Sequence, residues 1–230
     1  MRNKQITAQE AAAMIKDGAV VMAGGFLSNG AAENVIDAMV ASGVKDLTII
    51  CNDGGVYTPA NEELGTPDVY TGVAKLIHNK QVKKLIATHI GLNKEVAAQM
   101  NAGTLEVELV PQGSMAEKVR AGGAGLGGVL TPTGVGTDVA EGKETLTING
   151  KEYLLEMPLH ADVAIIKANK VDTYGNAIYK GTTKNFNTVM ATAADLVICE
   201  SDEVVEVGEI CSDAVMTPYI FVDYIVGGAK

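Results

Sequence analysis

The sequence contains no tryptophan, and aromatic side chains make up only 4% of its 230 residues. Basic residues are also scarce, with 18 lysines and arginines against 28 aspartates and glutamates, which gives a formal net charge of −10. A surface of this sign repels a phosphate backbone, and few rings are available to stack on bases. Nucleic acid is therefore excluded as an expected partner.

Long apolar runs are absent as well. The longest, residues 19–23, is far shorter than the roughly 20 residues that a membrane-spanning helix requires. Residues 1–18 lack the apolar segment of a secretory signal peptide. The only three cysteines show no CxxC pairing and lie in apolar segments (Cys51, Cys199 and Cys211), so we expect reduced core residues. A cytoplasmic protein without membrane contact or bound metal is expected.

Short apolar segments alternate with amphipathic ones along most of the chain. Strands are predicted over residues 19–23, 47–51, 84–90, 105–110, 162–169 and 196–200. Helices are predicted over residues 8–17, 31–42, 68–80, 93–103, 113–121 and 187–195. Thr7 and Glu10 form a capping box before the first helix. This alternation is typical of an α/β fold, a mostly parallel sheet with helices on both faces, and we predict a single domain over residues 1–230.

The alternation breaks at residues 122–137, GGAGLGGVLTPTGVGT, whose glycines disfavour a helix. After it, Asn149 and Gly150 separate two alternating segments and predict a β-hairpin over residues 145–156. Residues 123–128 also have the GxGxxG spacing of a dinucleotide fingerprint. That fingerprint should follow a strand and open a helix, and this segment does neither, so we expect a mobile or ligand-facing loop here.

The stretch VVMAGGFLSNG, residues 20–30, places two glycines after a predicted buried strand and before a predicted helix. Ligands bind at the carboxyl edge of parallel sheets, and the N-terminus of a helix carries a partial positive charge. Glycine also allows a ligand to approach the main chain closely. We therefore expect main-chain N–H groups here to bind phosphate or a developing oxyanion. A tight turn without a ligand is the alternative.

A nucleophile or general base does not stand out. The histidines, at positions 78, 89 and 160, lack metal-ligand spacing, and only His89, at a strand end, has a suggestive position. Glu200 ends a predicted strand and could point into a cleft, although a structural or solvated carboxylate is favoured there over a catalytic one. Acids such as Glu95 and Glu117 lie on helix faces that solvent should cover. The chain therefore offers main-chain donors and side-chain amides without a reactive partner, which indicates an incomplete site.

Residues 17–30, DGAVVMAGGFLSNG, resemble the signature of the family I coenzyme A transferases. The segments THIGLN, LEVELVPQG, AGGAGLGG and LTPTGVGT extend the resemblance to the α subunits of acetate, acetoacetate and butyrate CoA-transferases, so that it covers nearly the whole chain. The resemblance implies a CoA-transferase/NagB-like fold and transfer of CoA from an acyl-CoA to a free carboxylate. CoA is then a substrate, and no permanently bound cofactor is expected.

The same resemblance implies a β subunit, usually in an α2β2 heterotetramer. The attacking glutamate, which forms a glutamyl-CoA thioester, would lie on that β subunit. This implication agrees with the incomplete site inferred above, because the Ser-Glu-Asn-Gly-like setting of that glutamate does not occur in this sequence.

The resemblance also assigns site residues. Asn52, in CNDGG, matches an asparagine near the glutamate, and Gln112, in PQG, matches a donor to the substrate carboxylate or oxyanion. Neutral amides suit that role because they donate to negative charge without acting as a base. Without the resemblance, an Asx turn at Asn52 and a helix-entry hydrogen bond at Gln112 are favoured. The segment matched to CoA binding comprises Gly24, Gly25, Phe26, Leu27, Ser28, Asn29 and Gly30.

Two positions depart from the family pattern: Ala32 replaces a usual proline, and Asp53 replaces a common second asparagine. The first departure should affect the rigidity of the turn, and the second the charge of the pocket. Two other functions remain open at this level. One is a self-contained nucleotide-dependent enzyme, which lacks an acidic residue placed for a ribose. The other is a sugar-phosphate-binding protein, although a DNA-regulating sensor would need a basic helix-turn-helix extension.

Overall fold

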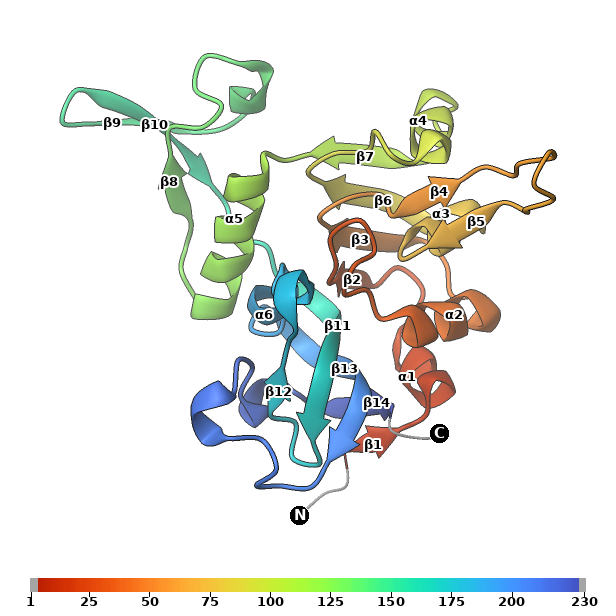
Figure 1. The fold of residues 1–230 in the computed structure, drawn as a ribbon. Coiled ribbons are helices and arrows are strands. Elements are labelled where there is room, and N and C mark those ends of the chain that lie inside the picture. Colours follow the sequence, from red (N-terminus) through yellow and green to blue (C-terminus); the bar gives the residue numbers. More distant parts are fainter. Residues whose placement is uncertain (1–3, 228–230) are drawn as a thin grey trace.

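A nine-stranded sheet forms the centre of the computed structural model, which describes residues 4–227 (Figure 1). In spatial order its strands are β1 (Gln5–Ile6), β14 (Tyr224–Gly227), β13 (Ala194–Val205), β11 (Ala161–Asp172), β2 (Val20–Ala23), β3 (Leu47–Cys51), β6 (Val82–Ala87) and β7 (Glu106–Leu109), with β12 (Ala177–Ile178) paired to β11. Only the pairing of β12 with β11 is antiparallel. The predicted mostly parallel α/β sheet is confirmed.

Helices cover both faces of this sheet (Figure 1). On one face lie α1 (Ala8–Met14), α2 (Glu33–Ser42), α3 (Ala74–His78) and α4 (Lys94–Asn101); on the other lie α5 (Gln112–Ala124) and α6 (Asn187–Met190). Strand β2 shows why both faces are apolar, because successive side chains of a strand point to opposite sides. Val21 and Ala23 join the core under α1–α4, whereas Met22 joins Met115 and Met190 in the core under α5 and α6.

The path of the chain across the sheet reverses at β2. From β2 the chain continues to β3, β6 and β7 on one side, whereas β11, β13 and β14 lie on the other side. Since β2 and β11 are parallel neighbours, their carboxyl ends lie together, and Gly24 N donates to Ile165 O at that edge. Open α/β sheets bind ligands at such a reversal point. The glycine-rich stretch after β2 therefore begins where the topology favours a site.

A three-stranded antiparallel sheet projects beside α5 (Figure 1). It consists of β8 (Val129–Thr131), β9 (Thr145–Ile148) and β10 (Lys151–Glu156). Asn149 and Gly150 have φ values of 52° and 77°, the left-handed conformations that a type I′ turn requires at both central residues. The predicted hairpin is confirmed. The smaller elements are the antiparallel strands β4 (Val56–Thr58) and β5 (Val69–Thr71) and the 3₁₀ turns η1 (Asp138–Ala140), η2 (Gly181–Lys184), η3 (Ser212–Ala214) and η4 (Tyr219–Phe221).

Two predicted helices are less than half as long in the structure as predicted. Residues 68–80 do not form one helix: their first part is β5, and only Ala74–His78 is helical. The sequence Val-Tyr-Thr favours a strand, and its pairing with β4 outweighs the helical pattern that follows. The helix predicted over residues 187–195 ends at Met190, because residues from Ala194 onward belong to β13.

The helix α5 is longer than predicted and includes Gly122 and Gly123. Both glycines are needed for close packing. A Cβ atom on Gly122 would lie 1.9 Å from Leu159 O, and one on Gly123 would lie 2.2 Å from Thr192 Oγ1. Tertiary packing therefore overrides the low helix propensity of these two residues.

The predicted capping box is present, since Thr7 Oγ1 accepts from Glu10 N at 3.1 Å and Thr7 N donates to Glu10 Oε2 at 2.8 Å. Two of the three cysteines are core residues as expected, and burial raises the pKa of both Cys51 and Cys199 to about 12. The expectation was wrong for Cys211, which is exposed in the segment between β13 and β14. Within residues 4–227, no helix combines the length and apolarity that crossing a membrane demands.

A buried carboxylate connects the projecting sheet to α5. Glu156, at the end of β10, is 1% exposed, and its two oxygens accept from Lys118 Nζ at 3.1 Å and Lys143 Nζ at 2.6 Å. Burial by itself would raise the pKa of Glu156, but the hydrogen bonds from Lys143 and Lys118 outweigh burial and hold the pKa below its ordinary value. This group therefore stabilises the fold in its ionised form.

Glu156→Gln should lower the free energy of unfolding by about 3 kcal/mol at neutral pH, because removing one partner of a buried ion pair leaves the other charges uncompensated. The folded-state pKa is depressed, so this contribution is fully present above the ordinary value of about 4.3 and is lost as pH falls through the lower folded value. Urea unfolding between pH 3 and 7 measures the difference. The exposed Glu152 on the same strand supplies the control Glu152→Gln, which should change little. Equal effects of the two variants would contradict the assignment.

Candidate active site

The two predicted amide residues meet in the structure. Asn52 directly follows β3, Gln112 is the first residue of α5, and Gln112 Nε2 donates to Asn52 Oδ1 at 2.6 Å. Asn52 is fully buried, whereas Gln112 is partly exposed. Local sequence favours an Asx turn at Asn52 and a helix-entry hydrogen bond at Gln112, but the two side chains bond to each other across the fold. The Asx-type contact in this loop belongs to Asp53, whose Oδ1 accepts from Gly55 N at 2.9 Å.

Asp53 lies behind the amide pair and is 2% exposed. Its Oδ2 accepts from Asn52 Nδ2 and from Leu27 N, both at 2.8 Å. With Gly55 N, three N–H groups thus point at one carboxylate, an arrangement that satisfies a buried negative charge. The negative charge of Asp53 is therefore stabilised by N–H groups of the protein itself.

The glycine turn, defined here as residues 24–30, is tightly folded. Phe26 and Asn29 exchange two main-chain hydrogen bonds, of 3.1 and 2.9 Å. Between them, Leu27 and Ser28 have φ values of 49° and 62°. Left-handed conformations are unfavourable for side chains of this kind and persist where the surroundings hold them. One such support is Thr71, whose Oγ1 donates to Ser28 Oγ at 2.9 Å.

A second set of contacts holds the glycine turn from the side of α6. Asn185 Oδ1 accepts from Gly25 N at 3.1 Å, and Asn185 Nδ2 donates to Asn29 O at 2.9 Å. Asn187 Nδ2 donates to Gly30 O at 3.0 Å. Neither asparagine was predicted from the sequence, in which both lie about 160 positions from the turn. The sequence signal for these contacts was the cluster of polar residues before α6, which does not indicate that the asparagines bond to the glycine turn.

The main-chain donors of the turn are largely engaged within the protein. The N–H groups of Gly24, Gly25, Phe26 and Leu27 donate to Ile165 O, Asn185 Oδ1, Asn29 O and Asp53 Oδ2, respectively. The sequence analysis expected such groups to face a ligand. These four instead fix the shape of the turn.

The N-terminus of α2 is also occupied. Glu200, in β13, is 1% exposed, and its carboxylate accepts from Val35 N and Asn34 Nδ2, both at 3.0 Å. Lys167 Nζ lies 3.3 Å from the same carboxylate. Glu200 therefore neutralises the partial positive charge of the helix end. Glu200 therefore has the structural role that the sequence favoured over a catalytic one, and its carboxylate occupies the position at this helix end where a phosphate was expected.

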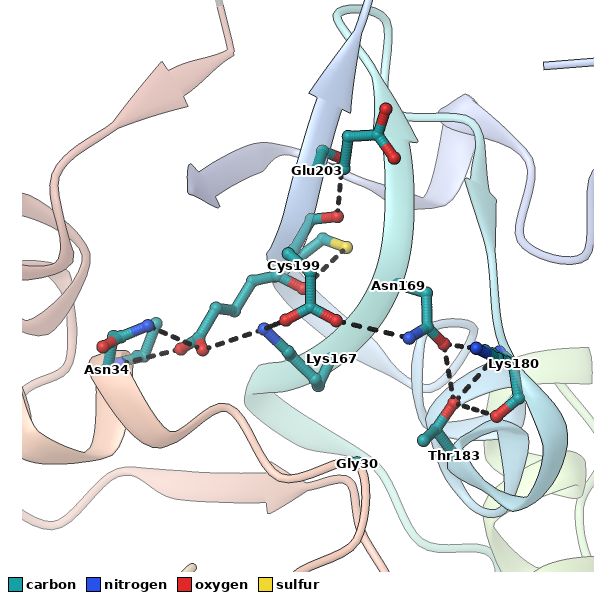
Figure 2. Close-up of polar contacts among 12 residues, drawn as sticks. Gly30, Asn34, Lys167, Asn169, Lys180, Thr183, Cys199 and Glu203 are labelled. Carbon is teal, nitrogen blue, oxygen red and sulfur yellow. Dashed lines mark hydrogen bonds and ion pairs between the residues drawn. The ribbon is translucent and has the colours of Figure 1, made fainter. Parts of the chain in front are cut away.

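Further polar contacts fix the carboxyl ends of β11 and β13 (Figure 2). Lys167 Nζ lies 2.7 Å from Asp202 Oδ1, and Asn169 Nδ2 donates to Asp202 Oδ2 at 3.2 Å. Burial lowers the pKa of Lys167, but Asp202 and Glu200 outweigh burial, and the net pKa is raised. Asn169 Oδ1 also accepts from Thr183 Oγ1 at 3.0 Å, which ties η2 to the sheet. Lys167 is therefore a structural cation at this edge.

A cavity of about 720 Å³ opens between α5 and α6, and two of the predicted site residues, Phe26 and Gln112, line it. Its walls include Phe26 of the glycine turn, Gln112 and Asn185, and the rest is mostly apolar. Arg120 is the one charged residue among those of residues 4–227 that line it, and no aspartate, glutamate, cysteine or histidine is among them. Among these lining residues the cavity thus presents amide groups without a carboxylate, thiol or imidazole.

His89 lies next to this cavity. Its ring centroid is 6.4 Å from that of Phe26, and its Nδ1 is 3.2 Å from Thr88 Oγ1. The other two histidines pair with surface acids, His78 with Glu95 at 3.0 Å and His160 with an aspartate at 4.0 Å. Across residues 4–227, no group of three or more histidine, cysteine, aspartate or glutamate side chains is arranged to hold a metal ion.

Fold and site together define an α/β protein with an amide-lined cavity beside a rigid glycine turn. The sequence profile described as Coenzyme A transferase matches residues 5–228. The acetate CoA-transferase subunit alpha of Escherichia coli (strain K12) is 47% identical over 226 residues, which cover 98% of this chain and 97% of the relative. The acetoacetyl-CoA:acetate/butyrate CoA transferase alpha subunit of Clostridium acetobutylicum is 48% identical over 226 residues, with 98% of each chain covered.

Among solved structures, an acyl-CoA transferase from E. coli O157:H7, in a thioester complex with CoA, aligns with a TM-score of 0.81 at 20% identity. The alignment covers 99% of this chain and 50% of the other, so this chain spans half the length of that transferase and shares its fold. The chain therefore belongs to the coenzyme A transferase family. The resemblance to family I α subunits drawn from the sequence is confirmed.

Gly24→Ala tests how closely the turn and α6 must approach. A Cβ atom at Gly24 would lie 1.8 Å from Asn187 Oδ1, so the asparagine would have to move away from Gly30. We expect a loss of about 2 kcal/mol in the free energy of unfolding, within the range for overpacking of a well-packed site. Urea unfolding measures it, with Gly91→Ala as control because a Cβ there meets nothing within 4 Å. An unchanged free energy of unfolding in Gly24→Ala would refute the close approach of Asn187 to the glycine turn.

Proposed function

We propose that the chain is the α subunit of a short-chain acyl CoA-transferase. It moves CoA from an acyl-CoA to a free carboxylate such as acetate, acetoacetate or butyrate, and a β subunit supplies the attacking glutamate. The observation that carries this proposal is Gln112, held by the buried Asn52, at the wall of a cavity whose lining residues within 4–227 include no carboxylate. Such a site can stabilise charge, and it needs a nucleophile from elsewhere.

In the proposed reaction the partner's carboxylate attacks the thioester carbonyl carbon. The carbonyl oxygen becomes an oxyanion, and CoA leaves as a thiolate, which yields an acyl-glutamyl anhydride. The thiolate then attacks the glutamyl carbonyl, so that the acyl group leaves as a carboxylate and a glutamyl-CoA thioester remains. The second carboxylic acid runs these steps in reverse. Gln112 is suited to donate to the oxyanion, because a neutral amide donates a hydrogen bond to negative charge without acting as a base.

The glycine turn has a different proposed role. Four of its N–H groups are engaged within the chain, whereas Phe26 is 40% exposed and Leu27 is 39% exposed. We therefore propose that residues 24–30 offer CoA a rigid, largely apolar surface next to Gln112. Because the turn is held from two sides, little conformational entropy is lost when the ligand binds. Binding energy from the CoA tail can then favour the transition state at the reacting centre.

Assembly follows from the same proposal. An α2β2 heterotetramer in the cytoplasm would close the open cavity with the surface that carries the glutamate, and each chain would contribute one domain. The rival nucleotide-dependent enzyme has less support. Residues 123–128 close α5 and precede β8, which is the reverse of the strand–turn–helix order that a dinucleotide fingerprint needs.

Gln112→Ala should lower the kcat of the assembled enzyme by about 100-fold, the loss typical of removing one oxyanion donor. The test measures transfer between acetoacetyl-CoA and acetate by the complex with its β subunit. Gln99→Ala is the matched control: Gln99 is also a helical glutamine that donates, to Ile77 O at 2.9 Å, but it lies in α4, away from the cavity. Full turnover by the Gln112→Ala complex would show that the role given to Gln112 is wrong.

A further inference from the structure

We infer that Asp53 is a positioning residue that fixes the orientation of the Gln112 side-chain amide through Asn52. The inference rests on the proposed function, since it concerns the donor that Gln112 offers to the substrate. It also gives a role to a position at which the sequence analysis noted a departure from the family pattern. Asp53 lies outside the large cavity and touches the reaction only through its neighbours.

The three side chains form a hydrogen-bonded chain with a defined direction. A carboxylate accepts hydrogen bonds and donates none. Asp53 Oδ2 therefore requires the Nδ2 group of Asn52, at 2.8 Å, to face it. The Oδ1 atom of Asn52 must then face Gln112, and of the two amide atoms of Gln112 only Nε2 can donate to it, at 2.6 Å. Thr88 Oγ1 lies 3.4 Å from the same oxygen and is the longer contact. The ionised end of the chain thus determines which atom of each amide points where.

The surroundings leave these groups little alternative. Asn52 is 0% exposed and Asp53 is 2% exposed, so water does not compete for their polar atoms. Asp53 is itself held by Leu27 N and Gly55 N, at 2.8 and 2.9 Å. Thr88 Oγ1 donates to Asn52 O at 2.8 Å and so fixes the main chain beside the amide. Asp53 therefore couples the glycine turn, through Leu27 N, to the pair formed by Asn52 and Gln112.

For the substrate, the consequence lies in the second Nε2 hydrogen of Gln112. With one hydrogen bound to Asn52, the other is the donor left for the cavity, and its position is set in advance. Donors that need no reorganisation during the reaction are the effective ones. In Asp53→Asn, one of the two oxygens that accept from Leu27 N and Gly55 N becomes an amide nitrogen, so either orientation of residue 53 leaves one main-chain N–H without its acceptor. Residue 53 then no longer dictates that Asn52 Nδ2 must face it, and the Gln112 donor loses its fixed position.

A double-mutant cycle in the assembled α–β enzyme tests the inference. Asp53→Asn should lower kcat about tenfold in the wild-type background, with the KM for acetoacetyl-CoA within about twofold. In the Gln112→Ala background the same change should lower kcat less than twofold, because the group it positions is gone. A structural role would lower kcat by the same factor in both backgrounds, and that result would overturn the inference.

Asp172→Asn is the matched control. Asp172 is also 2% exposed, and its Oδ1 accepts from Tyr174 N, Gly175 N and Asn176 N at 3.0, 2.9 and 2.9 Å, but it is the last residue of β11 and does not line the cavity. It should leave kcat unchanged while affecting stability much as Asp53→Asn does. Equal losses of kcat in the two variants would also contradict a positioning role.

A spectroscopic measurement keeps the inference testable if the wild-type complex shows no transferase activity, which would refute the proposed function alone. In the full chain labelled with ¹⁵N, the Gln112 side-chain amide signals, assigned by their loss in Gln112→Ala, should shift in Asp53→Asn and stay in place in Asp172→Asn. Unchanged Gln112 signals in Asp53→Asn would overturn the inference regardless of activity.

Discussion

The hydrogen bond between Gln112 and Asn52 is the contact on which the rest of the site depends. It joins Asn52, at the end of β3 in the central sheet, to the start of α5, which lies 60 positions later in the chain and packs on one face of that sheet. Asn52 is buried and must be paired, so the first turn of α5 can lie in only one place relative to the sheet. The wall of the cavity, and the position of the amide within it, follow from that pairing.

Rigidity of the glycine turn comes from the protein around it more than from the turn itself. Leu27 and Ser28 hold left-handed conformations that their side chains disfavour, and contacts from Asp53, Thr71 and Asn185 compensate. The turn is thus supported by β3, β5 and the segment before α6 together. A surface prepared in this way suits a long flexible ligand such as CoA, because the protein contributes little of the ordering that binding requires.

Much of the fold could be predicted from local signals. The apolar segments, the Thr7 capping box and the Asn149-Gly150 turn each specify local structure strongly, and all were found. The errors arose where distant packing decided the outcome. The two glycines of α5 are helical because Leu159 and Thr192 lie against them, and β5 forms because β4 pairs with it.

The site was partly predictable for the same reason. Asn52 and Gln112 were identified through the family resemblance, and the structure brings them together. Asn185 and Asn187 were missed, since nothing in their residue types indicates a partner about 160 positions away. Glu200 was noticed for its place at a strand end, but its function depends on the start of α2, which only the three-dimensional arrangement reveals.

The central claim is that this chain supplies positioned donors while the attacking carboxylate belongs to its partner. The most direct test is to incubate the assembled complex with acetoacetyl-CoA, digest it and locate the covalently bound CoA or acyl group by mass spectrometry. The account predicts an adduct on a glutamate of the β subunit and none on this chain. An adduct on any aspartate or glutamate of this chain would contradict it.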